Sequence, residues 1–284
     1  MDSQKRIGFI GAGKVGFSLG KYFVQHQIPV VGYYSKSQTS ASEAAAFTDT
    51  TCYQTIQALA GDSDVIFLTV PDGWISDVWK QLQSIHIRDK IVCHCSGAMA
   101  SDIFSDIDRY SCYGYSIHPL FAIHDRYDSY KELSKSMFTI EGHPKYLDAF
   151  LSFFQTLGNA CQVIPAEGKV RYHAAAAMAS NLMVALVSAC QKELIASGFS
   201  EENAKMALTP ILTTNLQHII EDGCVAALTG PLERGDTTTV SKHLQILEGN
   251  DRAIYQSLSR ELLGIAGKKN PERNYEKMEE LLKR

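Results

Sequence analysis

Apolar runs of strand length alternate with amphipathic stretches through the first part of the chain. The run over 64–70 is almost unbroken by polar residues and stops at Pro71, as is typical of a strand buried on both faces of a parallel sheet. Similar runs predict strands over 6–10, 29–34, 91–95, 113–117, 137–141 and 161–164, with helices over 13–25, 41–46, 74–82 and 146–157. Strands separated by helices in this order predict an α/β domain with a mostly parallel sheet.

The pattern changes after Pro165, where no further strand is predicted. One long helix is expected over 167–197, and shorter helices should follow caps at Ser200, Asp236, Asn250 or Asp251, and Asn270. The stretch over 173–190 is the most apolar of this region, but polar residues interrupt it, so we predict a buried helix and not a membrane span. We therefore expect an α/β domain over 1–165 and an all-α domain over 166–284.

Composition narrows the class of protein. The 284 residues are 45% hydrophobic and 20% charged, enough for two domains with sizeable cores. The net charge of −4 gives no electrostatic footprint for nucleic acid or an anionic membrane. Seven cysteines are an odd number and do not suggest a disulfide framework, and the short polar stretch before the first strand leads us to expect no targeting segment. We expect reduced thiols in a cytoplasmic protein.

A glycine-rich turn follows the first predicted strand. Residues 11–16 read G-A-G-K-V-G, a G-x-G-x-x-G motif that ends a strand and opens a helix. In this context the motif predicts a Rossmann-type dinucleotide site, in which the helix N-terminus binds the pyrophosphate. The residues expected to bind it are Gly11, Gly13, Lys14, Val15 and Gly16. The alternative is a glycine-rich turn that binds no ligand.

The end of the second predicted strand indicates which dinucleotide binds. An NAD site usually places a carboxylate there, but this chain has Ser35, Lys36 and Ser37, and its first carboxylate beyond them is Glu43. A lysine between two hydroxyls suits a 2′-phosphate, so we predict NADP. The alternative is a solvated polar turn without a ligand.

The motifs together resemble those of Rossmann-like proteins that carry a DUF2520 domain, within the wider 6-phosphogluconate-dehydrogenase-like superfamily. The matching segments lie at 7–16, 64–72, 94–98, 118–120, 169–181 and 228–236. The resemblance implies an NADP- or coenzyme-F420-dependent oxidoreductase whose helical, DUF2520-like domain serves substrate binding and dimerisation. It also implies a homodimer, and it does not name a substrate.

Several polar residues follow predicted strands and should line one crevice. Val70 and Pro71 are expected against the nicotinamide, with Ser96 and Gly97 beside it and Ser96 also in reach of substrate. His118 carries an imidazole, which titrates near neutrality and suits proton transfer. A serine after one strand and a His-Pro after the next is similar to the arrangement in prephenate dehydrogenases, where the histidine binds the reacting hydroxyl. The alternative is a histidine that only caps a strand end.

Three polar residues recur on the first helix of the predicted second domain. Lys169, His173 and Asn181 would share one face of a continuous helix and are candidates for acid-base chemistry. Related dehydrogenases carry a lysine and an asparagine on the corresponding helix, at a shorter spacing than here. The alternative is a solvated lysine with a satisfied core histidine and asparagine.

Two further groups complete the candidates. Arg234 could bind an anionic part of the substrate, pair with Asp236 or brace a dimer. Cys93 and Cys95 flank His94 on a strand that points them to the opposite face, so we predict buried thiols and no metal site.

The leading hypothesis is an NADP-dependent oxidoreductase that moves a hydride between nicotinamide and a small carbonyl, hydroxy or imine substrate between the domains. One alternative is a non-catalytic NADP-binding sensor or regulatory protein, and another is an F420-linked NADP reductase.

Overall fold

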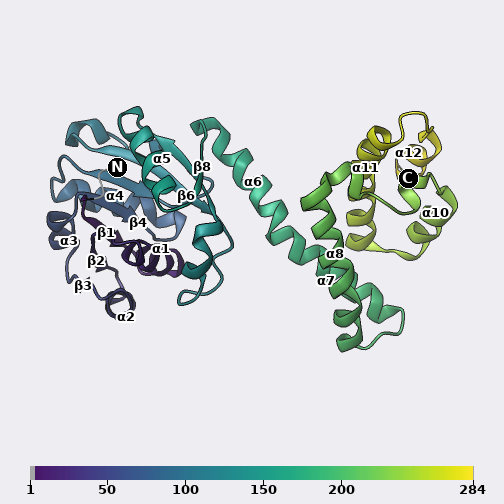
Figure 1. Ribbon diagram of the computed structural model, residues 1–284, viewed down its shortest axis with the longest axis horizontal. Coiled ribbons are helices and arrows are strands. Elements are labelled where there is room, and N and C mark those ends of the chain that lie inside the picture. Colours follow the sequence, from purple (N-terminus) through teal and green to yellow (C-terminus); the bar gives the residue numbers. More distant parts are fainter. Residues whose placement is uncertain (1–3, 284) are drawn as a thin grey trace. The chain divides into compact units, whose positions relative to one another are not determined.

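The computed structural model describes residues 4–283, and its N-terminal part is built on one eight-stranded sheet (Figure 1). The strand order is β3-β2-β1-β4-β5-β6-β7-β8, and neighbouring strands are parallel except for β6 and β7. The strands are β1 (Ile7–Ile10), β2 (Val30–Tyr34), β3 (Thr51–Cys52), β4 (Val65–Leu68), β5 (Ile91–His94), β6 (Tyr113–Leu120), β7 (Met137–Gly142) and β8 (Ala160–Val163). The predicted Rossmann-type, mostly parallel sheet is confirmed, and its order reverses between β1 and β4, where such sheets bind ligands.

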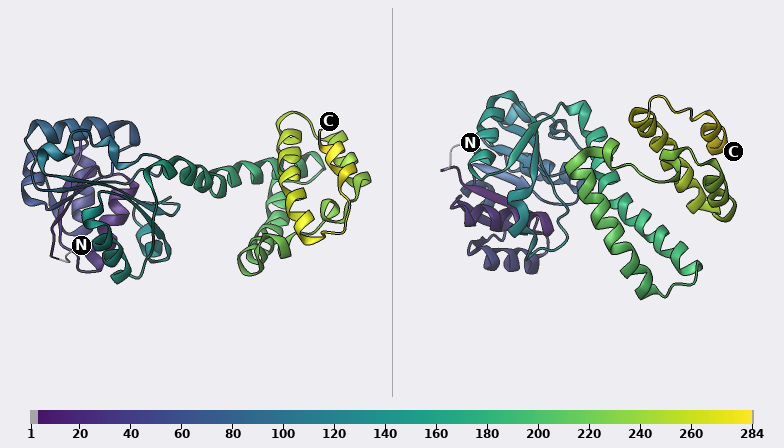
Figure 2. Two further views of the ribbon diagram at one scale, coloured as in Figure 1. Left: turned by 90° about the horizontal axis from the view of Figure 1, so that it is seen from above. Right: turned by 45° about the vertical axis from the view of Figure 1, so that its right-hand side comes forward.

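Helices cover both faces of the sheet (Figure 2). The core of one face joins α1 (Lys14–Gln25), α2 (Gln38–Thr48) and α5 (Leu147–Thr156), and the core of the other joins α3 (Ile56–Asp62) and α4 (Ile75–Ser84). Phe9 of β1 stacks on Tyr33 and Phe67 of the two neighbouring strands, so aromatic packing ties the centre of the sheet together. The short β3 and α3 were absent from the sequence prediction.

The chain divides into two compact units between Ser180 and Asn181. Helix α6 (Lys169–Ala179) therefore belongs with the sheet, and the domain boundary after Pro165 stays a prediction. The single helix expected over 167–197 is interrupted, because Ser180 has φ −114° and ψ −78° and α7 (Asn181–Ala196) starts after it.

Helix α7 corrects a second expectation. The apolar stretch was predicted to be buried, yet none of the α7 side chains is buried within the chain, and Val184 is 71% exposed. Among the described residues, one helical stretch, Ala166–Ala196, is long and apolar enough to cross a membrane by length and composition, and its most apolar window is not buried. The physical reason is that the helix packs against its neighbours on one side only, so its side chains stay half-buried or exposed.

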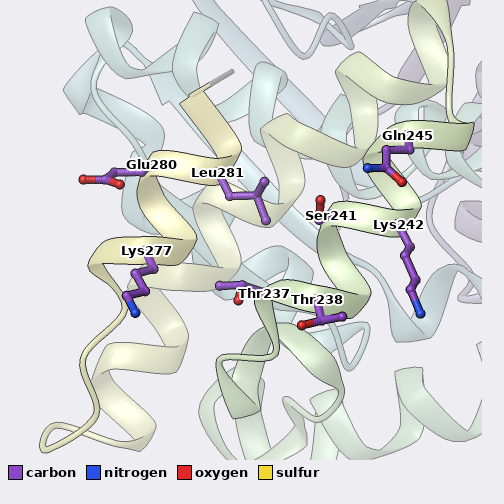
Figure 3. A pocket seen from close by; sticks show the side chains of 8 residues that line it. All are labelled: Thr237, Thr238, Ser241, Lys242, Gln245, Lys277, Glu280 and Leu281. Carbon is purple, nitrogen blue, oxygen red and sulfur yellow. The ribbon is translucent and has the colours of Figure 1, made fainter.

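The second unit continues with α8 (Glu201–Ala227), α9 (Pro231–Arg234), α10 (Thr237–Ile246), α11 (Gly249–Lys269) and α12 (Glu276–Lys283). Ser200 and Asp236 cap α8 and α10 as predicted, since each side chain accepts from a backbone N–H three residues on. Between α10 and α12 lies a groove of about 520 Å³ with mostly polar side chains, and none of the predicted site residues lines it (Figure 3).

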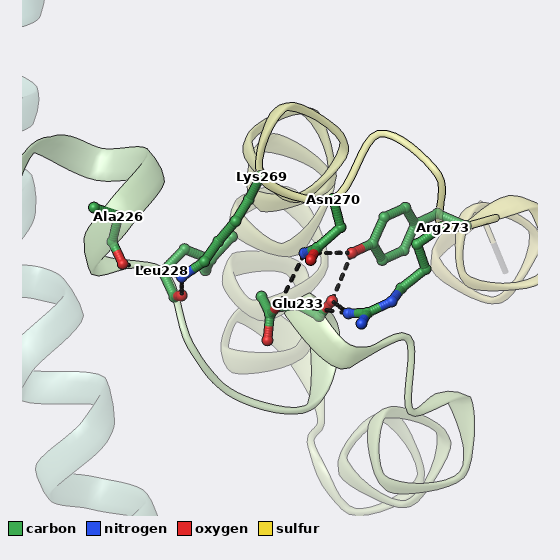
Figure 4. Close-up of polar contacts among 7 residues, drawn as sticks. Ala226, Leu228, Glu233, Lys269, Asn270 and Arg273 are labelled. Atoms are coloured by element: carbon green, nitrogen blue, oxygen red, sulfur yellow. Dashed lines mark hydrogen bonds and ion pairs between the residues drawn. The ribbon is translucent and has the colours of Figure 1, made fainter.

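Two cap predictions in this unit are wrong. Glu248 precedes α11, so neither Asn250 nor Asp251 is its cap. Asn270 ends α11 instead of starting the last helix, because its side-chain amide donates to Glu233 Oε1 at 2.7 Å. Arg273 and Tyr275 also donate to Glu233, and this network fixes the turn before α12 (Figure 4).

Candidate functional site

The glycine-rich turn joins β1 to α1 and owes its shape to two glycines. Gly11 has φ +106°, and a Cβ there would lie 2.7 Å from the backbone of Thr69. A Cβ on Gly16 would lie 2.6 Å from Thr69 Oγ1 and 2.7 Å from Gly11 O. Both positions therefore exclude a side chain, as predicted from the motif.

Gly13 has a different role in the same turn. Its nearest heavy atom to a built Cβ is Thr69 O at 3.8 Å, so the missing side chain leaves open space. Gly13 is also the N-cap of α1 and offers no side chain to the N–H groups of the first turn. Those N–H groups remain available to an anion. Lys14 is exposed as the first residue of α1, and Val15 packs against the core.

A cavity of about 250 Å³ extends from the glycine-rich turn toward β2. It brings together most of the predicted cofactor residues. Its walls include Gly11, Gly13, Ser35, Lys36, Ser40, Val70, Pro71 and Trp74. Ser37 does not line it, because its hydroxyl caps α2 by accepting from Ser40 N at 3.2 Å.

Lys169, at the start of α6, is buried beneath the ends of β5 and β6. Its Nζ donates to Ser96 O at 3.0 Å and to Ser116 Oγ at 2.7 Å, and only 1% of the residue is exposed. Burial lowers the pKa of its amine to about 8. Lys169 thus fixes α6 to the backbone of the loop after β5.

The hydroxyl of Ser96 is fully engaged. It donates to Asp72 Oδ2 at 2.7 Å and accepts from the backbone N–H groups of Ala98 and Met99. Asp72 is exposed on the turn that follows β4. Ser96 therefore orders the loop and joins it to a carboxylate.

His118 lies on β6 and faces α6. Its Nδ1 is 2.8 Å from the hydroxyl of Tyr172, and the two rings meet edge to face. A Cβ on Gly97 would lie 3.0 Å from His118 Nε2 and 2.5 Å from His173 Nδ1. Gly97 therefore packs closely against two imidazoles, and even a methyl group there would have to displace His173.

Burial changes the acid-base character of His118. Desolvation, followed by the charges of Lys169 and His173, lowers its pKa to about 4. The imidazole is therefore neutral near pH 7, which differs from the near-neutral titration expected from the sequence. His94 is also neutral, because burial lowers its pKa to about 4. Its Nδ1 accepts from Ser96 N, and its Nε2 donates to Ala100 O.

Of the remaining candidates, two belong to the second unit and two lie in the core of the first. Asn181 begins α7 in the second unit, so the break at Ser180 removes the shared helical face that linked it to Lys169. Arg234 is exposed at the end of α9, also in the second unit. Cys93 and Cys95 face the core opposite His94, and burial raises the pKa of both thiols.

Sequence reasoning missed several residues of this site. Tyr172 lies three residues after Lys169 on α6, and Ser116 lies two residues before His118 on β6, so the helical and strand periods contained a signal for both. Trp74 follows the predicted strand over 64–70, and its position just beyond the carboxyl end of that strand was the available clue. Asp72 was expected at this strand end, but its bond to Ser96 was not predicted.

Comparisons with known proteins agree with this fold. The Rossmann-like domain family matches residues 1–119, and the family called domain of unknown function DUF2520 matches residues 136–262. A pyrroline-5-carboxylate reductase of Vibrio alginolyticus is 26% identical over 219 residues, 72% of this chain and 74% of its own length.

Two solved structures share the fold over nearly the whole chain. A protein of Thermotoga maritima is 24% identical with a TM-score of 0.73, covering 93% of this chain and 99% of that chain. A pyrroline carboxylate reductase of Plasmodium falciparum with NADP bound is 12% identical with a TM-score of 0.61, covering 94% of this chain and 98% of that chain.

Proposed function

We propose that this chain, which carries a Rossmann-like domain followed by a DUF2520 domain, is an NADP-dependent reductase of small imines. The observation that carries the substrate class is the neutral imidazole of His118, whose Nε2 lies beside Gly97 in the loop after β5. The reductase named among the relatives acts on pyrroline-5-carboxylate, whose ring holds a C=N bond, and this supports the same reaction class.

The cavity beside the glycine-rich turn fits a dinucleotide with a 2′-phosphate. Gly13 leaves room for the pyrophosphate at the uncapped start of α1, and Lys36 with Ser35 provides a cation and a hydroxyl at the end of β2. A bound NADPH supplies the hydride. Ser96 and Gly97 follow β5 at the same edge of the sheet, where the nicotinamide half would meet the substrate.

Proton balance favours a C=N substrate over a C=O substrate. A carbonyl that gains a hydride becomes an alkoxide and needs a proton from an acid. A protonated imine that gains a hydride at its carbon becomes a neutral amine and needs none. His118 is neutral well below pH 7 and so has no proton to give at pH 7, and Lys169 is buried with two of its three ammonium hydrogens donated to Ser96 and Ser116.

Neutral His118 can instead accept a hydrogen bond from the protonated imine. In this arrangement the substrate N–H donates to Nε2, and Nδ1–H donates to the Tyr172 hydroxyl. The hydroxyl of Tyr172 interacts in turn with Thr139, whose own hydroxyl donates to His118 O at 3.4 Å. The carboxylate of Asp72, whose charge acts on His118, adds a negative potential that favours a cation.

A matched pair of ring compounds tests this proposal. NADPH oxidation would be followed with 1-pyrroline and with cyclopentanone, which share ring size and differ in the C=N and C=O groups. We expect kcat/KM to be at least tenfold higher for the imine. Equal values or a preference for the ketone would contradict imine specificity, and tight NADPH binding without turnover of either compound would favour the sensor hypothesis.

The exposed helices of the second unit support a homodimer, which we propose with α7 near its centre. Val184 on α7 and Ile220 on α8 are each 71% exposed. An apolar cavity of about 440 Å³ lies among α7, α8 and α11, and leucines of these helices line much of it. A patch of this extent is rare on a monomer, and a second copy is the occupant that these helices match. Seven free cysteines further support a cytoplasmic location.

A further inference from the structure

The chain has two tryptophans, and they occupy opposite environments. Trp79 on α4 is fully buried, and its Nε1 donates to Ser105 O at 2.9 Å. Trp74, on the turn Asp72–Trp74 after β4, is 49% exposed and lines the cavity beside the glycine-rich turn. A large aromatic ring left half in water at a ligand cavity has no role in the core, which indicates a role toward the ligand.

The face of Trp74 is covered by a single cation. Lys36 Nζ lies 3.7 Å from the centroid of the indole ring, within the range of a cation–π contact. Lys36 is the residue at the end of β2 that the proposed function assigns to the 2′-phosphate. The contact therefore links the ring to the group that distinguishes NADP from NAD.

We infer that Trp74 is the platform on which the adenine of NADP stacks, and that Lys36 covers this platform until a 2′-phosphate draws it away. This inference rests on the proposed NADP site but not on the proposed reaction. Adenine and the lysine ammonium compete for one face of the indole ring. A ligand with a 2′-phosphate gives Lys36 a new partner as it leaves the ring, so it gains both the ion pair and the stack.

A ligand without the 2′-phosphate has to displace Lys36 and gives it no partner in return. Specificity for NADP would then exceed what one lysine–phosphate contact provides, because the stacking energy is gained only when Lys36 moves. Base–aromatic stacking changes affinity by roughly ten- to hundredfold per base in proteins that bind single-stranded nucleic acid. Trp74 and Lys36 would thus act as one specificity element.

The test uses two ligands that lack the nicotinamide, adenosine 2′,5′-bisphosphate and adenosine 5′-monophosphate, with binding measured by calorimetry and by tryptophan fluorescence. We expect the bisphosphate to quench the emission of Trp74 and to bind Trp74→Leu roughly tenfold more weakly, as stacking predicts. Trp74→Phe should lose less, because it keeps an aromatic face. Trp79 remains in every variant as an internal fluorophore that the ligand does not reach.

Lys36→Gln tests whether Lys36 blocks the face of Trp74 or only binds the 2′-phosphate. We expect this variant to bind the bisphosphate more weakly but the monophosphate at least as tightly as the unaltered protein, because the ring is now open. Equal weakening for both ligands would overturn the inference, as would unchanged bisphosphate binding by Trp74→Leu. Those two results leave the NADP proposal standing, whereas no bisphosphate binding by the unaltered protein would overturn both.

Discussion

The hydroxyl of Tyr172 lies 2.8 Å from Nδ1 of His118, and the rings are nearly perpendicular at 83°. This contact joins α6 to β6 and leaves Nε2 of the imidazole beside Gly97. A second pair in the chain, Tyr255 and His243, has the same 2.8 Å contact and a similar angle of 86°. The second pair provides a control for what a tyrosine–histidine contact contributes to stability alone.

Tyr172→Phe is expected to lower kcat/KM for an imine by roughly tenfold, less than the hundredfold or more that loss of a direct acid or base costs, because Tyr172 only positions His118. The phenol no longer accepts from Nδ1–H, so the proton distributes between both ring nitrogens. Nitrogen NMR of His118 should show this change, and NADPH affinity should stay within twofold. Tyr255→Phe should alter stability only. If both variants turn over alike, Tyr172 has no positioning role.

Gly97→Ala is expected to reduce turnover at least tenfold with little loss of stability. The new methyl would come within 2.5 Å of His173 Nδ1 and 3.0 Å of His118 Nε2, so exposed His173 would rotate away and the methyl would cover the nitrogen proposed to accept from the substrate. Gly61→Ala is the matched control, because a Cβ there meets nothing within 4 Å. Steady-state kinetics and thermal melts would measure both. Normal turnover of Gly97→Ala would show that the substrate does not approach His118 Nε2 past Gly97.

Lys169→Met is expected to lower kcat/KM at least tenfold while the NADPH dissociation constant stays within about threefold. Methionine keeps the volume but loses the donors to Ser96 O and Ser116 Oγ, so the loop after β5 is released. Lys90 is a suitable control, since its Nζ donates to Ser63 O at 2.6 Å. Lys90→Met should retain activity, and the reverse ranking of the two variants would argue against a role for Lys169.

Stability should depend on pH through the buried His94. Its pKa is about 4 in the folded chain and near 6.5 when unfolded, so the unfolded state binds the proton first. Stability from this group is present above pH 6.5 and is lost as pH falls toward 4, by about 3 kcal/mol in total. Denaturant unfolding at several pH values should show a shallower loss in His94→Asn. An unchanged slope would mean that another group binds the proton.

The oligomeric state can be tested by charge on the exposed helices. Val184→Glu together with Ile220→Glu should convert a particle of about twice 31.4 kDa into a single chain at micromolar concentration, as measured by light scattering. Substitution of the exposed Lys80 by Glu on α4 is the control and should leave the mass unchanged. A 31.4 kDa particle for the unaltered protein would contradict the dimer.

The sheet and its glycine-rich turn were predictable because their signals are local. An unbroken apolar run such as 64–70 is explained by burial on both faces, and a glycine spacing by close backbone contacts. The break at Ser180 has no such signal, since neither glycine nor proline stands there. Asn270 beside Pro271 is typical of a helix start, but its amide is held by Glu233, from a distant part of the sequence.

The chemistry was predictable in position but not in protonation. His118 and Lys169 follow from strand ends and helix period, and the structure brings both to the same edge of the sheet as Ser96. Their pKa values depend on burial by residues far along the chain, which a sequence pattern does not report. The sequence therefore predicted neither the contact of His118 with Tyr172 on α6 nor the low pKa of the imidazole.

Helix α7 carries a kinetic consequence for how the protein forms. Because none of its side chains is buried by its own chain, the final burial of this surface in the proposed dimer requires an encounter between two chains. The last phase of refolding should then become faster in proportion to protein concentration, while formation of the sheet around β1 and β4 should not. After dilution from denaturant to a low protein concentration, a monomer with a folded sheet unit and an unpaired α7 should therefore persist.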